Sequence, residues 1–259
     1  MKVSAAQMSS TADPVLNLQD IEKNVRNAAD SGARLVVFPE ASMCPFGTDL
    51  ASVAEPLDGP FATALRELAA QHRVTVIAGM FTPADAGRVH NTLLITGAGV
   101  DASYNKIHLY DAFGSRESDT VAPGQDLVTF EIERMTIGVA TCYDLRFADQ
   151  FRALGRADVD LVVVPASWGE GPGKAAQWQL LVQARALDSQ AWILACDQAW
   201  NPPSGSDPLG IGNSMLVDPF GCVRAQLGHQ PALLSGEVDP SLARQARARI
   251  PLGEHAASF

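Results

Sequence analysis

Residues 13–40 read DPVLNLQDIEKNVRNAADSGARLVVFPE, and this stretch predicts one helix followed by one strand. Its apolar side chains recur at helical spacing, which is typical of a helix with one buried face. These side chains are Val15, Leu18, Ile21 and Val25. Asp13 suits the N-cap of that helix, Pro14 suits its first position, and Gly32 suits the turn that ends it. The short apolar run Leu35–Phe38 predicts a strand that is buried on both faces.

The same alternation continues along the chain. Two further helices are expected at Pro60–His72, with Phe61, Leu65 and Leu68 facing inward, and at Ala175–Gln190, with Leu180, Ala184 and Leu187 on one buried stripe. Further strands are expected at Val74–Ala78, Thr92–Thr96, Thr136–Ala140, Leu161–Val164, Trp192–Ala195 and Ser214–Val217. This alternation favours an α/β fold whose sheet is covered by helices. Residues 74–106 hold three strand-like segments that suggest hairpins, so a mixed sheet is expected.

Composition limits the classes of function. The chain has 259 residues, 47% of them hydrophobic and 19% charged, which is enough to form the core of one large domain over residues 1–259. Its formal net charge of -10 repels nucleic acid phosphates and anionic lipid headgroups. Neither a nucleic acid nor a membrane is therefore an expected partner.

The N-terminus and the cysteines favour a cytoplasmic location. Residues 1–7 read MKVSAAQ and lack the apolar run of a secretory signal, and no long apolar stretch follows. The four cysteines lack the spacing of a short disulfide framework, so free thiols are expected. We expect Cys44, Cys196 and Cys222 to be buried thiols. The five histidines show no metal-ligand spacing.

Three polar residues directly follow apolar strand-like runs, namely Glu40, Lys106 and Cys142. Ligands bind beyond the carboxyl ends of strands in open α/β sheets, so these side chains are expected to converge on one site. The Glu40 carboxylate would take the thiol proton, the Cys142 sulfur would attack a carbonyl or nitrile carbon, and the Lys106 ammonium would stabilise the resulting oxyanion. The backbone N–H of Tyr143 would join Lys106 in that last role.

Each of these residues also has a structural interpretation. A cysteine after an apolar strand is often a small buried hydrophobic residue. A glutamate at a strand end is often solvated or caps a helix, and a lysine at a turn usually lies on the surface. Only the joint placement of Glu40, Lys106 and Cys142 favours the catalytic interpretation.

Several segments across the chain resemble, in the same order, the signatures of the nitrilase superfamily of carbon-nitrogen hydrolases. The segments around the predicted site are Phe38–Glu40, Tyr104–Leu109, Arg116–Ser118 with Pro123–Gly124, and Cys142–Phe147. The others are Pro165–Trp168, Gln177–Trp178, Ala184–Ala186, Gly212–Met215 and Asp218–Gly221. The string CYDLRF at residues 142–147 resembles the branch that contains ω-amidases and deaminated-glutathione amidases.

The resemblance implies a four-layer αββα sandwich of mixed sheets that uses no metal and no organic cofactor. It implies that Glu40 is the general base, Lys106 the oxyanion stabiliser and Cys142 the nucleophile. Glu117 matches the second glutamate of the family, which orients the lysine and the substrate. Family members are usually dimers or larger arrays, so a homodimer or larger homo-oligomer is expected. Residues 244–259 would form a C-terminal extension that either contacts the partner or packs against its own domain.

Two signals concern the substrate. Family members that hydrolyse nitriles typically have Trp-Glu after the cysteine, whereas this chain has Tyr143 and Asp144, which favours an amide. Substrates of the branch carry a carboxylate remote from the amide, and the guanidinium of Arg146 is a candidate to bind it. Arg146 could equally form a structural ion pair with Asp144 or Asp149. Trp168 is expected in the pocket wall, with core packing as the alternative.

Other functions stay open at this point. N-carbamoyl amino-acid hydrolysis and nitrile hydrolysis use the same fold, and a non-catalytic binding protein could retain it. Two positions also depart from the branch pattern, because Ala148 replaces a proline and Asn213 replaces a histidine. The second change affects the pocket or the dimer contact, which leaves the exact substrate undefined.

Overall fold

A computed structural model of the chain describes residues 1–202, 207 and 209–252. The first sheet, in the order β12-β1-β2-β3-β4-β5, consists of β1 (Lys2–Gln7), β2 (Leu35–Val37), β3 (Thr75–Pro83), β4 (Val89–Gly97), β5 (Val100–Asn105) and β12 (Ala232–Glu237). The second sheet, in the order β11-β10-β9-β8-β7-β6, consists of β6 (Thr129–Ile132), β7 (Met135–Val139), β8 (Leu161–Ala166), β9 (Trp192–Asp197), β10 (Met215–Val217) and β11 (Val223–Gln226).

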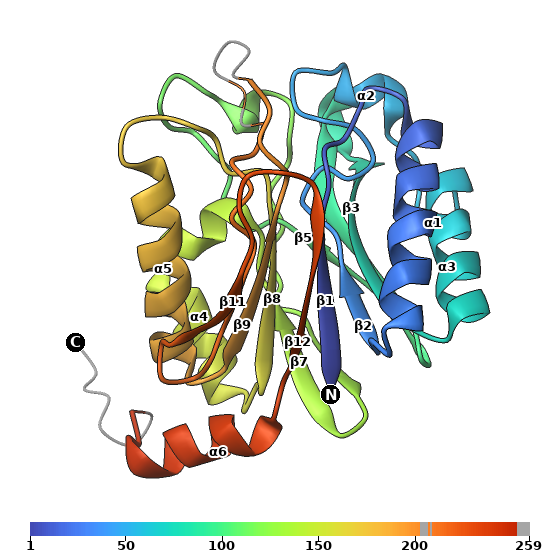
Figure 1. Cartoon of the computed structure of the whole chain (residues 1–259). Helices are drawn as coiled ribbons and strands as arrows, with labels where there is room; N and C mark the ends of the chain where they lie inside the picture. Colours follow the sequence, from blue (N-terminus) through green and yellow to red (C-terminus); the bar gives the residue numbers. More distant parts are fainter. Residues whose placement is uncertain (203–206, 208, 253–259) are drawn as a thin grey trace.

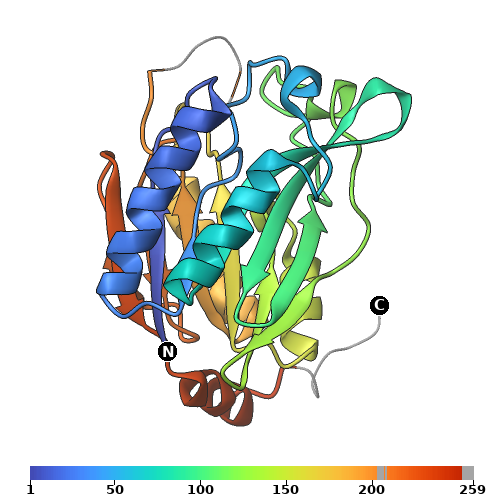
Figure 2. The same cartoon turned by 90° about the vertical axis from the view of Figure 1, so that its right-hand side faces the viewer.

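Helices cover the outer face of each sheet. The described helices are α1 (Pro14–Asp30), α2 (Leu50–Val53), α3 (Pro60–His72), α4 (Ala148–Arg156), α5 (Lys174–Ser189) and α6 (Pro240–Arg249), and the 3-10 helices are η1 (Asp85–Gly87), η2 (Glu117–Asp119) and η3 (Cys142–Arg146). Helices α1 and α3 lie side by side over the first sheet (Figure 2), and α4 and α5 cover the second. The result is the four-layer α/β sandwich of mixed sheets that the family resemblance implies (Figure 1).

The uniformly apolar strands follow from this layering. Successive side chains of a strand point to opposite faces, and both faces are covered here. In β8, Val163 packs between the two sheets, whereas Val162 and Val164 pack in the cluster that includes α4 and α5. Every residue of β8 is therefore buried.

Strand direction brings the predicted site residues to one edge. Strands β1, β2 and β3 are parallel, and so are β7, β8 and β9. Strands β3, β4 and β5 form two antiparallel pairs, as the predicted hairpins require, so β5 runs in the same direction as β3. Glu40 follows β2, Lys106 follows β5 and Cys142 follows β7, all at carboxyl ends.

The first helix begins where its sequence predicts. The Asp13 carboxylate accepts a hydrogen bond from the backbone N–H of Val15 at 2.8 Å, and Gly32 adopts a φ of +88° after the helix ends. The expected burial of Val15 is wrong, because its side chain is 62% exposed. Ile21 and Val25 form the buried part of the stripe.

The expected buried stripe of α5 is also wrong. Leu180 and Leu187 are 67% and 50% exposed, whereas Trp178, Val182 and Ala186 are buried. Two residues along a helix correspond to a rotation of about 200°, so a stripe through Trp178 lies almost opposite one through Leu180. The Trp178 indole also donates a hydrogen bond to the backbone carbonyl of Asn213 at 2.9 Å, which ties this face to the second sheet.

Two further points concern the ends and surfaces of the molecule. Across residues 1–202, 207 and 209–252, every helix falls short of the length or apolar character needed to cross a membrane. Of the C-terminal segment 244–259, residues 244–249 belong to α6, while residues 253–259 lie outside the described part of the chain.

Candidate active site

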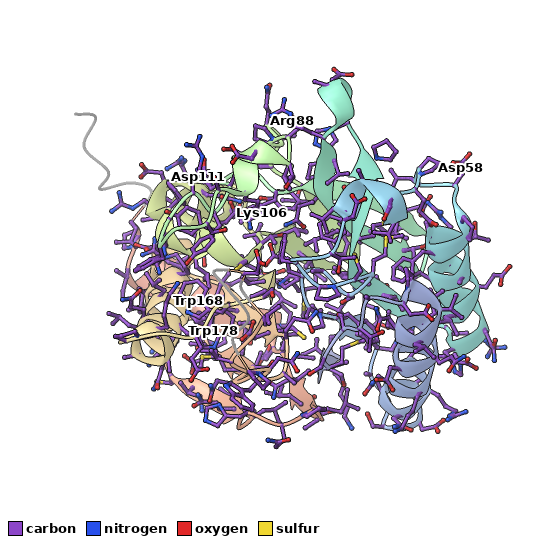
Figure 3. The ribbon with its side chains drawn as sticks, turned by 90° about the horizontal axis from the view of Figure 1, so that it is seen from above. Asp58, Arg88, Lys106, Asp111, Trp168 and Trp178 are labelled. Atoms are coloured by element: carbon purple, nitrogen blue, oxygen red, sulfur yellow. The ribbon has the colours of Figure 1, made fainter. Side chains whose placement is uncertain are left out.

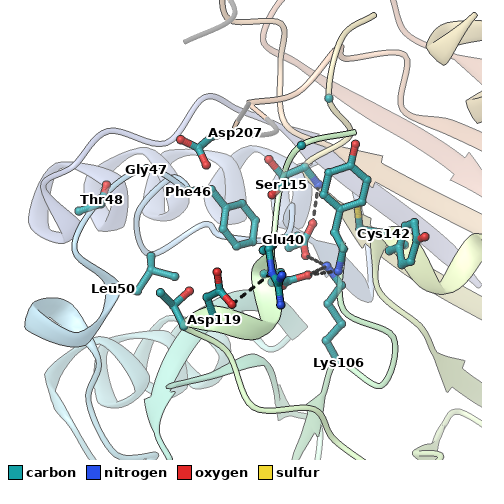
Figure 4. Close-up of a pocket in the computed structure, with 18 of the residues that line it drawn as sticks. Glu40, Phe46, Gly47, Thr48, Leu50, Lys106, Ser115, Asp119, Cys142 and Asp207 are labelled. Carbon is teal, nitrogen blue, oxygen red and sulfur yellow. Dashed lines mark hydrogen bonds and ion pairs between the residues drawn. The ribbon is translucent and has the colours of Figure 1, made fainter. Parts of the chain in front are cut away.

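Four side chains that the sequence singles out line one cavity of about 650 Å³, and they are Glu40, Lys106, Glu117 and Cys142. Figure 4 shows the labelled Glu40, Lys106 and Cys142 grouped around it. Seen from above, Lys106 and Trp168 lie near the middle of the molecule, whereas Asp58 lies at its edge (Figure 3). The cavity therefore opens at the carboxyl-end edge of the strands, between the two sheets.

Lys106 is an ammonium held between two carboxylates. Its Nζ donates hydrogen bonds to Oε1 of Glu40 and to Oε2 of Glu117, both at 2.8 Å. Only 2% of Lys106 is exposed. Glu117 begins η2, and its Oε2 also accepts the backbone N–H of Tyr110 at 2.6 Å. The second glutamate thus helps to fix the position of the ammonium.

Glu40 is bonded through both of its carboxylate oxygens. Oε1 accepts from Lys106 and from the side-chain amide of Asn91 at 2.7 Å, while Oε2 accepts the backbone N–H of Ser167 at 2.9 Å. Ser167 follows β8 of the second sheet. The carboxylate therefore joins the two sheets at the cavity and has a fixed orientation.

Asn91 is a site residue that sequence reasoning missed. Its Nδ2 donates to Oε1 of Glu40 and to Oε1 of Glu117 at 3.0 Å, so one amide group holds both carboxylates. Asn91 lies in β4 and is 1% exposed. The available signal was its position directly before the apolar run of the strand expected at Thr92–Thr96, because an amide that is buried beside such a run needs hydrogen-bond partners.

Cys142 lies at the turn from β7 into η3. Its φ of +44° is in the left-handed region, which is uncommon for a residue other than glycine and is often found at functional sites. The side chain is 6% exposed and lines the cavity. The sharp turn presents Sγ to the cavity beyond the end of the strand.

Asp144 connects this turn to the segment that holds Lys106. Its Oδ2 accepts the backbone N–H of Thr141 at 2.8 Å and the hydroxyl of Tyr104 at 2.6 Å, and its Oδ1 accepts the backbone N–H of His108 at 3.0 Å. Tyr104 and His108 flank Lys106 in the sequence. The nucleophile turn and the lysine are thus positioned relative to each other by one buried carboxylate.

The pKa values of the three groups suit proton transfer rather than a resting thiolate. Burial and the negative charge of Glu40 raise the pKa of the Cys142 thiol well above its usual value, although Lys106 opposes this. Burial, partly offset by Lys106, also raises the pKa of Glu40, and repulsion from Glu117 adds to the shift. Burial opposes the charge on Lys106, but Glu117 and Glu40 hold its pKa well above the usual value. The sulfur is therefore protonated at rest beside an ammonium and a carboxylate of raised basicity.

The three predicted substrate-binding residues are placed differently. Tyr143 and Trp168 line the cavity. Trp168 is 3% exposed, and the centre of its ring lies 5.4 Å from that of Trp178. Trp168 therefore forms part of the cavity wall and also packs in the hydrophobic core. Arg146 is not among the described lining residues, because its Nη2 donates to Gln177 at 2.8 Å and its guanidinium lies 5.0 Å from the Trp168 ring.

The alternative ion pair of Arg146 is also not formed within the described residues. Asp144 is engaged by Tyr104 and His108, and Asp149 lies 3.7 Å from Arg152. Neither aspartate therefore accounts for the position of the Arg146 guanidinium.

The remaining cysteines differ in exposure. Cys44 and Cys196 are buried as expected, but the expectation for Cys222 is wrong, because it is exposed. Cys222 lies in the turn between β10 and β11. Within residues 1–202, 207 and 209–252, no group of three or more His, Cys, Asp or Glu side chains is placed to hold a metal ion.

Comparison with known proteins agrees with this architecture. The family model for carbon-nitrogen hydrolases matches residues 2–248. A hydrolase of Mycobacterium tuberculosis is 45% identical over 271 aligned positions that cover 100% of this chain and 96% of the relative. The deaminated glutathione amidase of Escherichia coli O157:H7 is 35% identical over 257 positions, covering 97% of this chain and 95% of the relative.

A solved structure shows the same fold. Nit3 of Saccharomyces cerevisiae, a member of branch 10 of the nitrilase superfamily, superposes with a TM-score of 0.85 at 26% sequence identity. The match covers 97% of this chain and 94% of the yeast protein.

Proposed function

The chain belongs to the carbon-nitrogen hydrolase family, the nitrilase superfamily, and is a hydrolase of non-peptide amide bonds, and we propose that it converts a small carboxamide with a remote carboxylate into an acid and ammonia through a cysteinyl thioester. One observation carries this proposal. An ammonium held by two carboxylates lies with a buried thiol in the wall of one cavity.

In the first half-reaction, Sγ of Cys142 attacks the amide carbon while Glu40 accepts the thiol proton. The carbonyl oxygen becomes an oxyanion that the Lys106 ammonium and the backbone N–H of Tyr143 stabilise. Glu40 then donates its proton to the amide nitrogen, the carbon–nitrogen bond breaks, and ammonia leaves. The raised pKa of Glu40 suits both the uptake and the release of this proton.

In the second half-reaction, a water molecule attacks the thioester carbon. Glu40 accepts a proton from that water, and the same two donors stabilise the second oxyanion. The carbon–sulfur bond then breaks, the carboxylic acid forms, and the proton returns from Glu40 to Sγ. The cycle consumes one water per amide and regenerates the thiol.

Glu117 would act through Lys106 as a positioning residue. Without it, the ammonium would have one carboxylate partner and could pair fully with Glu40, which would weaken Glu40 as a base. With two equidistant partners at 2.8 Å, the ammonium stays between them and can point a third N–H at the oxyanion. Tyr143 and Trp168 would form walls around the substrate, and binding of the carboxylate by Arg146 stays a prediction.

A trapping experiment tests the mechanism. Wild-type protein supplied with a dicarboxylic monoamide and hydroxylamine should release ammonia and form the hydroxamate, because hydroxylamine intercepts the thioester. Cys142→Ala should do neither, whereas Cys222→Ala, the matched change at an exposed thiol, should do both. Ammonia release by Cys142→Ala at the wild-type rate would contradict the proposal.

The same assay separates the other functions of this fold. An N-carbamoyl amino acid would release carbon dioxide together with ammonia, and a nitrile would consume two waters on the way to the acid. A binding protein without activity would release no ammonia from any of them. Brief iodoacetamide treatment adds a further check. Cys142 should react because it lines the cavity and Glu40 can accept its proton, whereas the buried Cys44 and Cys196, which do not line the cavity, should not react. The exposed Cys222 serves as an internal reference.

Three wider expectations remain predictions of the proposed function. They are a single catalytic domain, a homodimer or larger homo-oligomer, and a cytoplasmic location. Light scattering coupled to size-exclusion chromatography would test the oligomer, and limited proteolysis would test whether the chain is cut into stable parts. Cell fractionation would test the location.

A further inference from the structure

Lys174 is a second buried cation in the wall of the active-site cavity. It is the first residue of α5, it lines the cavity that also contains Cys142, and it is 5% exposed. The mechanism described above does not use it. A buried ammonium is costly unless an anion or several hydrogen bonds compensate its charge, so its surroundings indicate what it is for.

No carboxylate of the described residues compensates Lys174. Its Nζ donates to the hydroxyl of Tyr110 at 3.0 Å, and none of the described acids lies within 4.0 Å of it. Asp49, Asp119 and Asp207 line the same cavity but do not pair with it. Burial and the positive charge of Arg146 hold the pKa of Lys174 below its usual value.

Aromatic rings hold the ammonium in place. Its Nζ lies 4.3 Å from the ring centre of Phe113, 5.0 Å from that of Tyr110 and 5.3 Å from that of Trp168. Ring faces attract a cation but leave its N–H groups free of strong acceptors. One N–H bonds to Tyr110, so the ammonium retains donors for a ligand.

Two links tie Lys174 to the catalytic carboxylates. Trp168 Nε1 donates to the backbone carbonyl of Lys174 at 3.0 Å, and the preceding residue, Ser167, donates to Glu40. Tyr110 accepts from Lys174 through its hydroxyl and donates its own backbone N–H to Glu117. Tyr110 therefore contacts Lys174 with its hydroxyl and Glu117 with its backbone. A substrate with a short carbon chain can span the same distance.

We propose that Lys174 binds the remote carboxylate of the substrate and thereby selects anionic amides, an inference that rests on the proposed amidase function. A carboxylate beside Nζ would supply the missing counter-charge and two acceptor oxygens. The positive end of the 16-residue helix α5 begins at this residue and favours the same charge. Arg146, whose guanidinium lies 5.0 Å from the centre of the Trp168 ring, adds positive potential without being among the lining residues of the cavity.

Paired substrates test this selection. Succinamate and butyramide differ in having a carboxylate or a methyl group at the end of the same carbon chain, and glutaramate and pentanamide form a second pair. Lys174→Met should lower the ratio of kcat/KM for the anionic over the neutral member on the order of tenfold to a hundredfold, mainly through KM. Lys174→Arg should retain much of the ratio, and Lys23→Met, the same change on the exposed face of α1, should retain all of it.

Glutarate binding supplies a readout that does not need turnover. Glutarate should slow alkylation of Cys142 by iodoacetamide, and Lys174→Met should require about tenfold more glutarate for the same protection. If wild-type protein hydrolyses no amide, the proposed function fails, but this protection still tests Lys174. Equal protection of Cys142 by glutarate in wild type and Lys174→Met would overturn the inference. The inference would also be wrong if the ratio of kcat/KM for anionic over neutral amides fell in Arg146→Met but not in Lys174→Met.

Discussion

Lys106 and Lys174 lie in the wall of the same cavity, are 2% and 5% exposed, and differ chiefly in their partners. Lys106 is paired with two carboxylates at 2.8 Å, whereas Lys174 has a phenol and aromatic rings. Two lysines of similarly low solvent exposure therefore have different electrostatic surroundings. The two carboxylates hold the Lys106 ammonium in place, where it can stabilise the oxyanion that develops during the reaction. Lys174 has no such partner among the described residues, so its ammonium is available to a carboxylate of the substrate.

The largest effect that tests this difference is expected from Lys106→Met. Loss of the ammonium removes an oxyanion donor and should lower kcat by roughly a hundredfold to a thousandfold. It also leaves Glu40 and Glu117 buried without their cation, so the melting temperature should fall. Steady-state kinetics and thermal unfolding measure both. A kcat within about threefold of wild type would show that Lys106 is merely structural.

Asn91→Leu should have the next largest effect, because Asn91 holds the same two carboxylates without carrying a charge. We expect kcat to fall about tenfold to a hundredfold while KM changes little, since the amide positions Glu40 and does not line the cavity. Asn91→Gln, which retains the donor, should recover part of the loss. A change confined to KM would instead place Asn91 in substrate binding.

The pH profile should reveal the environment of Glu40. Its pKa is raised by burial, so the carboxylate base is lost as pH falls through a value above the usual carboxyl range near ~4.3. The acid limb of kcat/KM should therefore lie above that range. Because the Asn91 hydrogen bond lowers the pKa of Glu40, Asn91→Leu should move the limb to higher pH. A limb that moves to lower pH would contradict this assignment.

The smallest effect is expected in stability, and there Lys174 should behave opposite to Lys106. Because no acid of the described residues pairs with Lys174, Lys174→Met removes a buried charge and should increase the free energy of unfolding by about 0.5–2 kcal/mol. Chemical denaturation of the free protein measures it, with Lys23→Met as the exposed control. A large loss of stability in Lys174→Met would mean that the ammonium has a structural role.

Much of the site follows from positions in the sequence. Glu40, Lys106 and Cys142 each come shortly after the end of a strand, and strands of one direction bring such positions to the same edge. Glu117 was implied only by the family resemblance, because it lies eleven positions after Lys106 and local spacing does not define its place in the fold. The structure brings its carboxylate to the same ammonium as Glu40.

The wrong predictions of burial arose because nearby sequence does not determine which surfaces are covered in the folded protein. The buried stripe of α5 was assigned to Leu180 and Leu187, but the face that meets the second sheet carries Trp178 and Val182. Several apolar residues occupy more than one face of this helix, so periodicity alone does not decide which face is covered. Cys222 was expected to be buried because of its residue type, yet it lies in an exposed turn.

By itself, the sequence determined the alternation of helices and strands, the capping of α1, and the residues that end the strands at the catalytic edge. These features depend on local backbone preferences and on hydrophobic periodicity, which neighbouring residues encode. Only the tertiary structure decided that Asn91 joins two carboxylates and that Lys174 is buried without an acidic partner among residues 1–202, 207 and 209–252. Whether a buried charge has a partner depends on every segment packed around it, and no window of sequence contains them all.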